Sequence, residues 1–203
     1  MTADIKAIIF DFGAVLVEWE PRNIFRNYFP DNASIDAFLQ EIDFKQWNVE
    51  QDKGRSFAEG THLLAQKFPQ HKEAFRALQE RWGESIVGEI EGTVQLLHAL
   101  KAKGYPIYGL SNWSAETFPI ARARYEFFEL FDDMVISGEV KLIKPEPAIF
   151  EYCLQKIGRP SYECLFIDDS EPNIISATKL GFDCIHFKSP QQLKEELQKR
   201  ELL

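Results

Sequence analysis

Cysteine is scarce in this chain of 203 residues, and long apolar runs are missing from it. The three cysteines, Cys153, Cys164 and Cys184, are scattered without a CxxC pair, which argues against a disulfide framework and against a zinc site. No run approaches the ~20 apolar residues that a membrane-spanning helix requires. The N-terminal segment MTADIKAIIFDFG has four apolar residues in a row before a charge, too few for a secretory leader. We therefore expect a cytoplasmic protein without a membrane partner.

Positive charge is also in deficit, because 23 Lys and Arg face 32 Asp and Glu and the formal net charge is −9 at pH 7. A nucleic-acid partner needs a basic footprint for its phosphates, so we expect none. An anionic small molecule is compatible with this balance, since the field of one site can oppose that of the whole protein. The hydrophobic share of 45% and the 17 Phe residues suffice for a sizeable buried core. The oligomeric state is left open.

Short apolar runs recur along the chain, and each closes on turn or polar residues. They are AIIF at 7–10, PIYGL at 106–110, DMVIS at 133–137, CLFI at 164–167 and CIHF at 184–187. Stretches with helical spacing lie between most of them, and several end at a glycine suited to a helix C-cap. Continuous apolar strands that alternate with helices are typical of a parallel sheet covered on both faces. The sequence thus predicts an α/β fold with a Rossmann-like, three-layer parallel-sheet core.

One region interrupts this alternation. Residues 19–88 contain no convincing buried strand but show helical patterning at 32–42, 56–68 and 72–82, punctuated by proline and glycine. We interpret this region as an inserted α-helical cap subdomain. The core then comprises residues 1–18 and 89–203, and the first and last turns of the insertion are the expected hinges.

Polar residues of the types found in catalytic and binding sites follow these apolar runs. Ligands of an open parallel sheet bind outside the carboxyl ends of its strands, so residues that follow the strands are candidates for a site. In chain order these are Asp11, Ser111, Asn112, Lys144, Asp168 and Asp169. They come from segments far apart in the sequence, which makes a chance arrangement less plausible. Each has a simpler reading when taken alone, such as a helix N-cap for Asp11 or a solvated surface position for Lys144.

The charges of these residues indicate a chemistry. Three carboxylates repel one another unless a cation is present, and a set of oxygen ligands suits Mg²⁺. The Lys144 ammonium and the Ser111 hydroxyl would complete a cradle for a phosphoryl group. A carboxylate at such a site can attack phosphorus and form an aspartyl-phosphate, which water then hydrolyses.

Four segments carry a resemblance to a known family. IIFDFGAVLV, LSNWS, KPEPAIF and FIDDSEPNI resemble the four motifs of the haloacid dehalogenase superfamily of hydrolases, in the family's order and over essentially the whole chain. The pattern is closest to sugar-phosphatase-like members with a helical cap, and it is similar to the amino-terminal phosphatase domain of soluble epoxide hydrolase. The resemblance implies a Mg²⁺-dependent phosphatase acting on a small phosphorylated metabolite, with sugar phosphates favoured.

The resemblance also implies a metal-binding group of residues. Asp11 would be the nucleophile and a direct Mg²⁺ ligand, and Gly13 would offer its backbone carbonyl to the metal. Asp169 would bind Mg²⁺ directly, while Asp168 would bind the ion or its waters. Asn173 would orient this loop from behind the metal ligands.

A second group would hold the phosphate. The resemblance assigns phosphoryl oxygens to Ser111 and to the backbone of Asn112, and it assigns neutralisation of both nucleophile and phosphate to Lys144. Lys141 is the main rival for that role, but Lys144 immediately precedes Pro145 and fits the motif better. Trp113, directly after the second motif, is a candidate for lining the pocket entrance.

Gly13 departs from the commonest pattern of family phosphatases, which place an aspartate there as general acid and base. Glycine cannot transfer a proton, and such a loss is expected to cost ~10²–10⁴ in rate. The sequence offers Glu50 or Asp52 in the cap, Glu18 in a loop, or water as the substitute.

Two other functions stay open because of this departure. A haloacid dehalogenase uses the same aspartate without a metal or a leaving-group acid, but an Asp168–Asp169 pair beside Asp11 would be electrostatically costly without a cation. A catalytically weak member serving as a metabolite-binding or interaction protein is the other alternative, and Gly13 is its only support.

The cap segment 43–54 is the expected substrate-facing stretch. Trp47 could stack on a ring, and Lys45 or Arg55 could meet a second anionic group. The interpretation we favour for Phe44 and Trp47 is simpler, because their i, i+3 spacing is that of residues packing the cap helices together.

Overall fold

The structure is a computed structural model that describes residues 4–203. Its centre is a five-stranded sheet with the order β5-β4-β1-β6-β7, in which all neighbouring strands pair in parallel. The strands are β1 (Ala7–Phe10), β4 (Ile107–Ser111), β5 (Asp133–Ile136), β6 (Cys164–Asp168) and β7 (Asp183–His186). β1 and β6 are buried along their whole length, as their continuous apolar sequences predict. The predicted parallel α/β core is confirmed.

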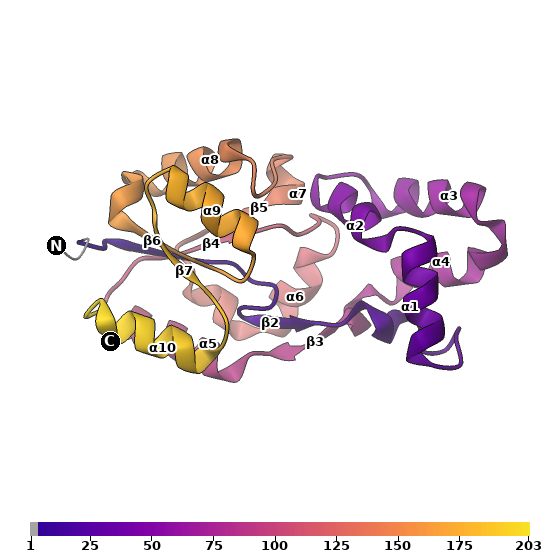
Figure 1. Ribbon diagram of the computed structural model, residues 1–203, viewed down its shortest axis with the longest axis horizontal. Coiled ribbons are helices and arrows are strands. Elements are labelled where there is room, and N and C mark those ends of the chain that lie inside the picture. The colour runs from indigo at the N-terminus through magenta and orange to yellow at the C-terminus, as the bar shows by residue number, and fades with distance from the viewer. Residues whose placement is uncertain (1–3) are drawn as a thin grey trace.

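Helices cover both faces of this sheet, so the core has three layers (Figure 1). On one face lie α5 (Glu91–Ala102), α6 (Phe118–Arg124) and α10 (Pro190–Lys199). On the other lie α8 (Pro147–Ile157) and α9 (Glu171–Lys179). Alternate residues of β1 supply the two apolar clusters, since Ile8 packs with the first group of helices and Ile9 with the second. Within the described part of the chain, no helix is both long and apolar enough to cross a membrane.

A helical lobe follows β1 in the sequence and lies beside the sheet (Figure 1). It contains α1 (Asn32–Glu41), α2 (Phe44–Asp52), α3 (Phe57–Lys67) and α4 (Lys72–Glu80). The Asp31 and Ser56 side chains cap α1 and α3 by accepting hydrogen bonds from the backbone N–H groups of Ser34 and Glu59. We keep the name cap for residues 19–88, the bounds proposed from the sequence.

The cap has an aromatic core of its own. Its buried rings are Phe25, Phe38, Phe44, Trp47, Phe57, Phe75 and Trp82. Trp47 stacks on Phe44 with 5.7 Å between ring centroids and meets Phe57 edge-on at 5.3 Å. Phe44 and Trp47 therefore pack the cap helices together, which supports the simpler interpretation of their spacing.

A short antiparallel ribbon joins the cap to the core, and the sequence analysis did not predict it. β2 (Val17–Trp19) pairs with β3 (Ile86–Glu89), and the register shifts between Glu18 and Trp19. Only Val17 in β2 and Ile86 in β3 are fully buried, so neither strand shows the apolar run that identifies the central strands. The ribbon sets both ends of the cap side by side.

The turn after β1 is anchored by an aromatic side chain. Phe12 is completely buried, stacks on Phe118 at 5.8 Å and meets Phe128 edge-on at 5.1 Å. The ring lies over Gly109 of β4, where a Cβ atom would overlap it. The absence of a side chain at Gly109 thus makes room for the residue that fixes the position of Asp11.

We expect Gly109→Ala to lower the free energy of unfolding by about 1–3 kcal/mol, because the added methyl group must displace the Phe12 ring. Urea titration measures this change. Gly88→Ala in β3 is the matched control, since a Cβ there meets nothing within 4 Å. Equal stability of the two variants would contradict the role given to the close approach at Gly109.

Candidate active site

Asp11 follows β1 and is held by one of its two carboxylate oxygens. Oδ1 accepts hydrogen bonds from the Phe12 backbone N–H at 2.7 Å and from the Ser111 hydroxyl at 2.8 Å. The same atom lies 3.0 Å from Nζ of Lys144. No donor among residues 4–203 contacts Oδ2. One oxygen therefore fixes the side chain, and the other is available to a cation or an electrophile.

Lys144 lies between two carboxylates. Its Nζ is 2.7 Å from Oδ2 of Asp168, donates to the Leu110 carbonyl at 2.8 Å, and is almost completely buried. Burial of the ammonium lowers the pKa of Lys144, but the carboxylates of Asp11 and Asp168 outweigh this effect and raise it overall. The lysine is therefore charged at neutral pH. Lys141, the rival position, is exposed.

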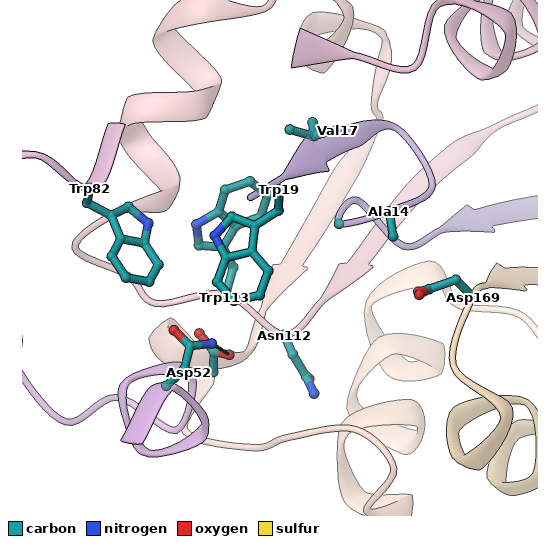
Figure 2. Close-up of a pocket in the computed structure, with 10 residues that line it drawn as sticks. Ala14, Val17, Trp19, Asp52, Trp82, Asn112, Trp113 and Asp169 are labelled. Carbon is teal, nitrogen blue, oxygen red and sulfur yellow. Dashed lines mark hydrogen bonds between the residues drawn. The ribbon is translucent and has the colours of Figure 1, made fainter. Parts of the chain in front are cut away.

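The two carboxylates of the fourth motif have different surroundings. Asp168 is fully buried and accepts hydrogen bonds from the Ser170 backbone at 2.8 Å and from the Asn173 amide, which is 3.0 Å from both oxygens. Asp169 is exposed, and its carboxylate points toward the cavity beside the site (Figure 2). Asp168 thus holds Lys144, whereas Asp169 is free to receive a ligand.

The second motif is tied to the loop that carries the lysine. The Asn112 side chain donates to the Lys144 carbonyl at 3.0 Å and accepts from the Lys144 backbone N–H at 2.9 Å. Trp113 donates its backbone N–H to Ser137 at 2.9 Å and its indole N–H to Thr117 at 3.1 Å. These bonds fix the segment after β4, directly beyond Ser111, whose hydroxyl binds Asp11.

The acidic residues form a group that suits a divalent cation. One carboxylate oxygen from each of Asp11, Asp168 and Asp169 lies within 4.8 Å of the other two. Three carboxylates and the Lys144 ammonium sum to a charge of −2 when all are ionised. Burial and, more weakly, the charge of Asp168 raise the pKa of Asp11 to about 7 and also raise the pKa of Asp169. A set of oxygen ligands in a group with a net negative charge fits Mg²⁺.

Two cavities open beside this group. The first, of ≈ 290 Å³, has Ala14 and Asp169 at one end and three indoles, Trp19, Trp82 and Trp113, at the other (Figure 2), and Gly13 also lines it. The second, of ≈ 550 Å³, includes Asp11, Lys144 and the cap residue Lys45 in its wall. Trp19, Asn48 and Asn112 line both, so the cavities are adjacent. Arg55 lines neither, because its guanidinium binds Gln51 at 2.7 Å inside the cap.

Of the carboxylates suggested by the sequence as proton donors, Asp52 lines the first cavity. It ends α2, accepts a hydrogen bond from the Asn48 amide at 2.9 Å and is bonded by the Ser114 backbone. Burial raises the pKa of Asp52 to about 7, helped by the charge of Asp11 and opposed by the Ser114 bond and Lys144. Glu18 is exposed on β2, and Glu50 is bonded to Gln46 beside a different cavity.

Three cap residues of the cavity wall were not singled out from the sequence, although one of them, Asn48, lies within the predicted substrate-facing segment 43–54. Trp19, Asn48 and Trp82 contribute to the first cavity, and all three lie in the predicted cap. Trp19 and Trp82 stand at opposite ends of the insertion, yet their rings are 6.2 Å apart. The sequence signal that could have identified Trp19 and Trp82 is the presence of a tryptophan near each end of the insertion.

Comparison with known proteins identifies the family. A model described as a haloacid dehalogenase-like hydrolase matches residues 5–181. A sesquiterpene phosphatase of Aspergillus oryzae is 26% identical over 92% of this chain and 91% of its own length. A drimenol cyclase of Aspergillus calidoustus is 25% identical over 95% of this chain, which spans only 36% of that protein. A similar structure is the crystal structure of a HAD family enzyme of Bacteroides thetaiotaomicron in complex with magnesium and inorganic phosphate. Its TM-score is 0.71 and its sequence identity is 25%, over 91% of this chain and 95% of that one.

The net negative charge of the acidic group predicts that the site binds a metal ion. We expect Mg²⁺ at a hundredfold excess over its Kd to stabilise the fold by about 2.7 kcal/mol, which corresponds to roughly 5–10 °C in Tm. EDTA should reverse this shift, and Asp169→Asn should abolish most of it. Asp36→Asn, at an exposed position in α1, is the control. A Tm that does not respond to Mg²⁺ would contradict the metal site.

Proposed function

Since the chain belongs to the haloacid dehalogenase-like hydrolases, we propose that it is a Mg²⁺-dependent phosphatase that forms an aspartyl-phosphate on Asp11. The observation that carries the proposal is the carboxylate of Asp11, whose Oδ1 is fixed by three donors, whose Oδ2 has no donor within residues 4–203, and which lies in one acidic group with Asp168 and Asp169. The sesquiterpene phosphatase among its relatives and the magnesium and phosphate in the similar enzyme support it. The substrate is a small phosphorylated metabolite.

Each polar residue of the site has a proposed part in binding. Asp11, the Gly13 carbonyl and Asp169 would hold Mg²⁺, with Asp168 beside them. Ser111 and the Asn112 backbone would bind phosphoryl oxygens, and Lys144 would neutralise the charge that nucleophile and phosphate bring together. Asn173 positions Asp168 through the two 3.0 Å contacts of its amide. When bound, Mg²⁺ supplies Lewis-acid polarisation of the phosphoryl group.

The reaction needs a proton at two points, and we assign both transfers to Asp52. Oδ2 of Asp11 attacks phosphorus, the bond from phosphorus to the alcohol oxygen breaks, and the Asp52 carboxyl gives that oxygen its proton. Water then attacks phosphorus, the bond to Oδ2 breaks, and the Asp52 carboxylate accepts a proton from the water. A pKa of about 7 suits both transfers near neutral pH. Asp52 would thus replace the acid that Gly13 lacks.

The alternatives from the sequence are weaker on physical grounds. Dehalogenation without a metal would leave three carboxylates against the one ammonium of Lys144, a net charge of −2 when all four groups are ionised. A binding protein without activity loses its only support if Asp52 supplies the proton. The three free cysteines fit a reducing compartment, and the cytoplasm is the proposed location. The family resemblance favours sugar phosphates as substrates.

We expect the purified protein to release phosphate from phosphomonoesters in Mg²⁺ and to lose this activity in EDTA. Asp11→Asn removes the nucleophile and should lower kcat by at least ~10³-fold. The assay includes 2-haloacids, tested with and without Mg²⁺. Halide release that needs no metal, in the absence of phosphate release, would contradict the phosphatase and support the dehalogenase.

We expect Asp52→Asn to act selectively on esters with poor leaving groups. For 2-phenylethyl phosphate, whose alkoxide must be protonated, kcat should fall by ~10²–10³-fold, whereas 4-nitrophenyl phosphate should be affected little. Because the pKa of Asp52 is raised to about 7, its protonated fraction and the rate with the alkyl ester should fall as pH rises above 7. Glu50→Gln is the control. Equal losses with both esters would remove Asp52 from the role of general acid.

A further inference from the structure

A single buried hydroxyl group joins the cap to the loop that follows β4. Ser137 begins the short helix α7 (Ser137–Val140), directly after β5, and is completely buried. Its Oγ accepts a hydrogen bond from the Trp113 backbone N–H at 2.9 Å and donates one to the Asp52 carbonyl at 2.6 Å. The hydroxyl therefore bridges a residue of the second motif and the residue that ends α2 of the cap.

The Ser137 proton has one well-placed acceptor. The Trp113 carbonyl oxygen lies 3.4 Å from Oγ, beyond the usual range of a hydroxyl hydrogen bond, and already accepts the Gly138 backbone N–H at 3.1 Å. The last carbonyls of a helix have no partner within it, and Asp52 is the last residue of α2. Ser137 thus supplies the donor that the end of this helix needs.

The side chain of Asp52 is held by the same part of the core. Its carboxyl group accepts a hydrogen bond from the backbone of Ser114, the residue after Trp113, and another from the Asn48 amide at 2.9 Å. Asp52 lies beside the segment that carries Trp113 (Figure 2). The loop after β4 therefore binds the Asp52 carboxyl directly and its carbonyl through Ser137.

The backbones around this hydroxyl approach one another closely. A Cβ atom at Gly138 would overlap the Ala115 backbone nitrogen and the Trp113 carbonyl oxygen. On the cap side, a Cβ atom at Gly54 would lie 3.0 Å from the Gly138 carbonyl oxygen. Cap, α7 and loop are thus packed together around Ser137, which favours one fixed arrangement.

We infer that Ser137 is a positioning residue, whose hydroxyl holds the end of α2 against the second motif and so keeps the Asp52 carboxyl in the wall of the first cavity. The inference rests on the proposed function, in which Asp52 transfers the proton, and gives a role to a residue outside the four motifs. Without the hydroxyl, the Asp52 carbonyl loses its donor. A small displacement of the carboxyl group is then enough to slow proton transfer.

Ser137→Ala should act selectively on esters that need a proton for the leaving group. In Mg²⁺, kcat with 2-phenylethyl phosphate should fall by about 10-fold, the effect of one hydrogen bond, whereas 4-nitrophenyl phosphate should be affected little. A general loss of stability, or a displaced phosphate-binding loop, would instead lower both rates alike.

Ser85→Ala is the matched control. Ser85 is also completely buried, donates to the Trp82 carbonyl at 2.7 Å and accepts from the Trp19 indole at 3.2 Å, but its bonds do not lead to Asp52. This variant should keep the wild-type ratio of the two rates. Thermal unfolding checks that both variants fold.

A double-mutant cycle tests whether Ser137 acts through Asp52. In the Asp52→Asn background, Ser137→Ala should change kcat with 2-phenylethyl phosphate by about 2-fold or less, because no proton donor is left to position. The same 10-fold loss as in the wild type would show that Ser137 acts by another route.

Hydrogen exchange at the end of α2 supplies a readout that needs no turnover. The Gly54 and Arg55 N–H groups bond to carbonyls of the last turn of this helix. Both should exchange about 5–10-fold faster in Ser137→Ala than in the wild type, since one hydrogen bond to the core is lost. Ser85→Ala should leave their exchange unchanged.

Three outcomes would overturn the inference: equal losses with both esters, an undiminished effect in the Asp52→Asn background, or unchanged exchange at Gly54 and Arg55. If the wild type hydrolyses neither ester, the phosphatase proposal fails, and the part of Asp52 in proton transfer fails with it. Hydrogen exchange then decides by itself whether Ser137 holds the end of α2 in place.

Discussion

A lysine ammonium buried between two carboxylates is the interaction on which the rest of this structure depends. Lys144 lies 3.0 Å from Asp11 and 2.7 Å from Asp168, and water reaches the three side chains very little. Removing one member of such a buried group typically costs about 3–5 kcal/mol, because a charge stays behind without a partner. Asp11 follows β1 and Asp168 ends β6, and the two carboxylates can share Lys144 because those strands are neighbours in the sheet. The strand order of the core therefore places these three charged side chains together at the edge of the sheet that carries the candidate site.

The candidate site combines residues of the cap with residues of the core. The Asp52 carbonyl accepts a hydrogen bond from Ser137 at 2.6 Å, and the Phe57 backbone N–H donates to Glu116 at 3.3 Å, so the end of α2 is fixed against the core. Asp52 and Trp82 belong to the cap, whereas Asp11 belongs to the core. In the proposed mechanism, neither unit alone holds the nucleophile, the proton donor and the cavity wall. The proposed reaction therefore depends on the packing between cap and core.

The core half of the site was predictable from the sequence, whereas of the cap half only Asp52, Lys45 and the segment 43–54 around them were expected near the substrate. Asp11, Ser111 and Asp168 lie at the carboxyl ends of apolar runs, and parallel strands bring such ends to one edge. The cavity wall follows no comparable rule. Trp19 and Trp82 meet only through the pairing of β2 with β3, whose mostly exposed residues give little apolar signal. The surroundings of Asp52 likewise follow from packing between cap and core, which residue spacing does not encode.

The central claim is that Oδ2 of Asp11 is the atom that receives the phosphoryl group. A crystal structure of the protein with Mg²⁺ and beryllofluoride, which mimics an acyl phosphate, tests it most directly. The account predicts beryllofluoride attached to Oδ2 of Asp11, with the ion between Asp11 and Asp169 and with Lys144 beside the fluorides. Beryllofluoride on another residue, or an ion bound away from the three carboxylates, would contradict it.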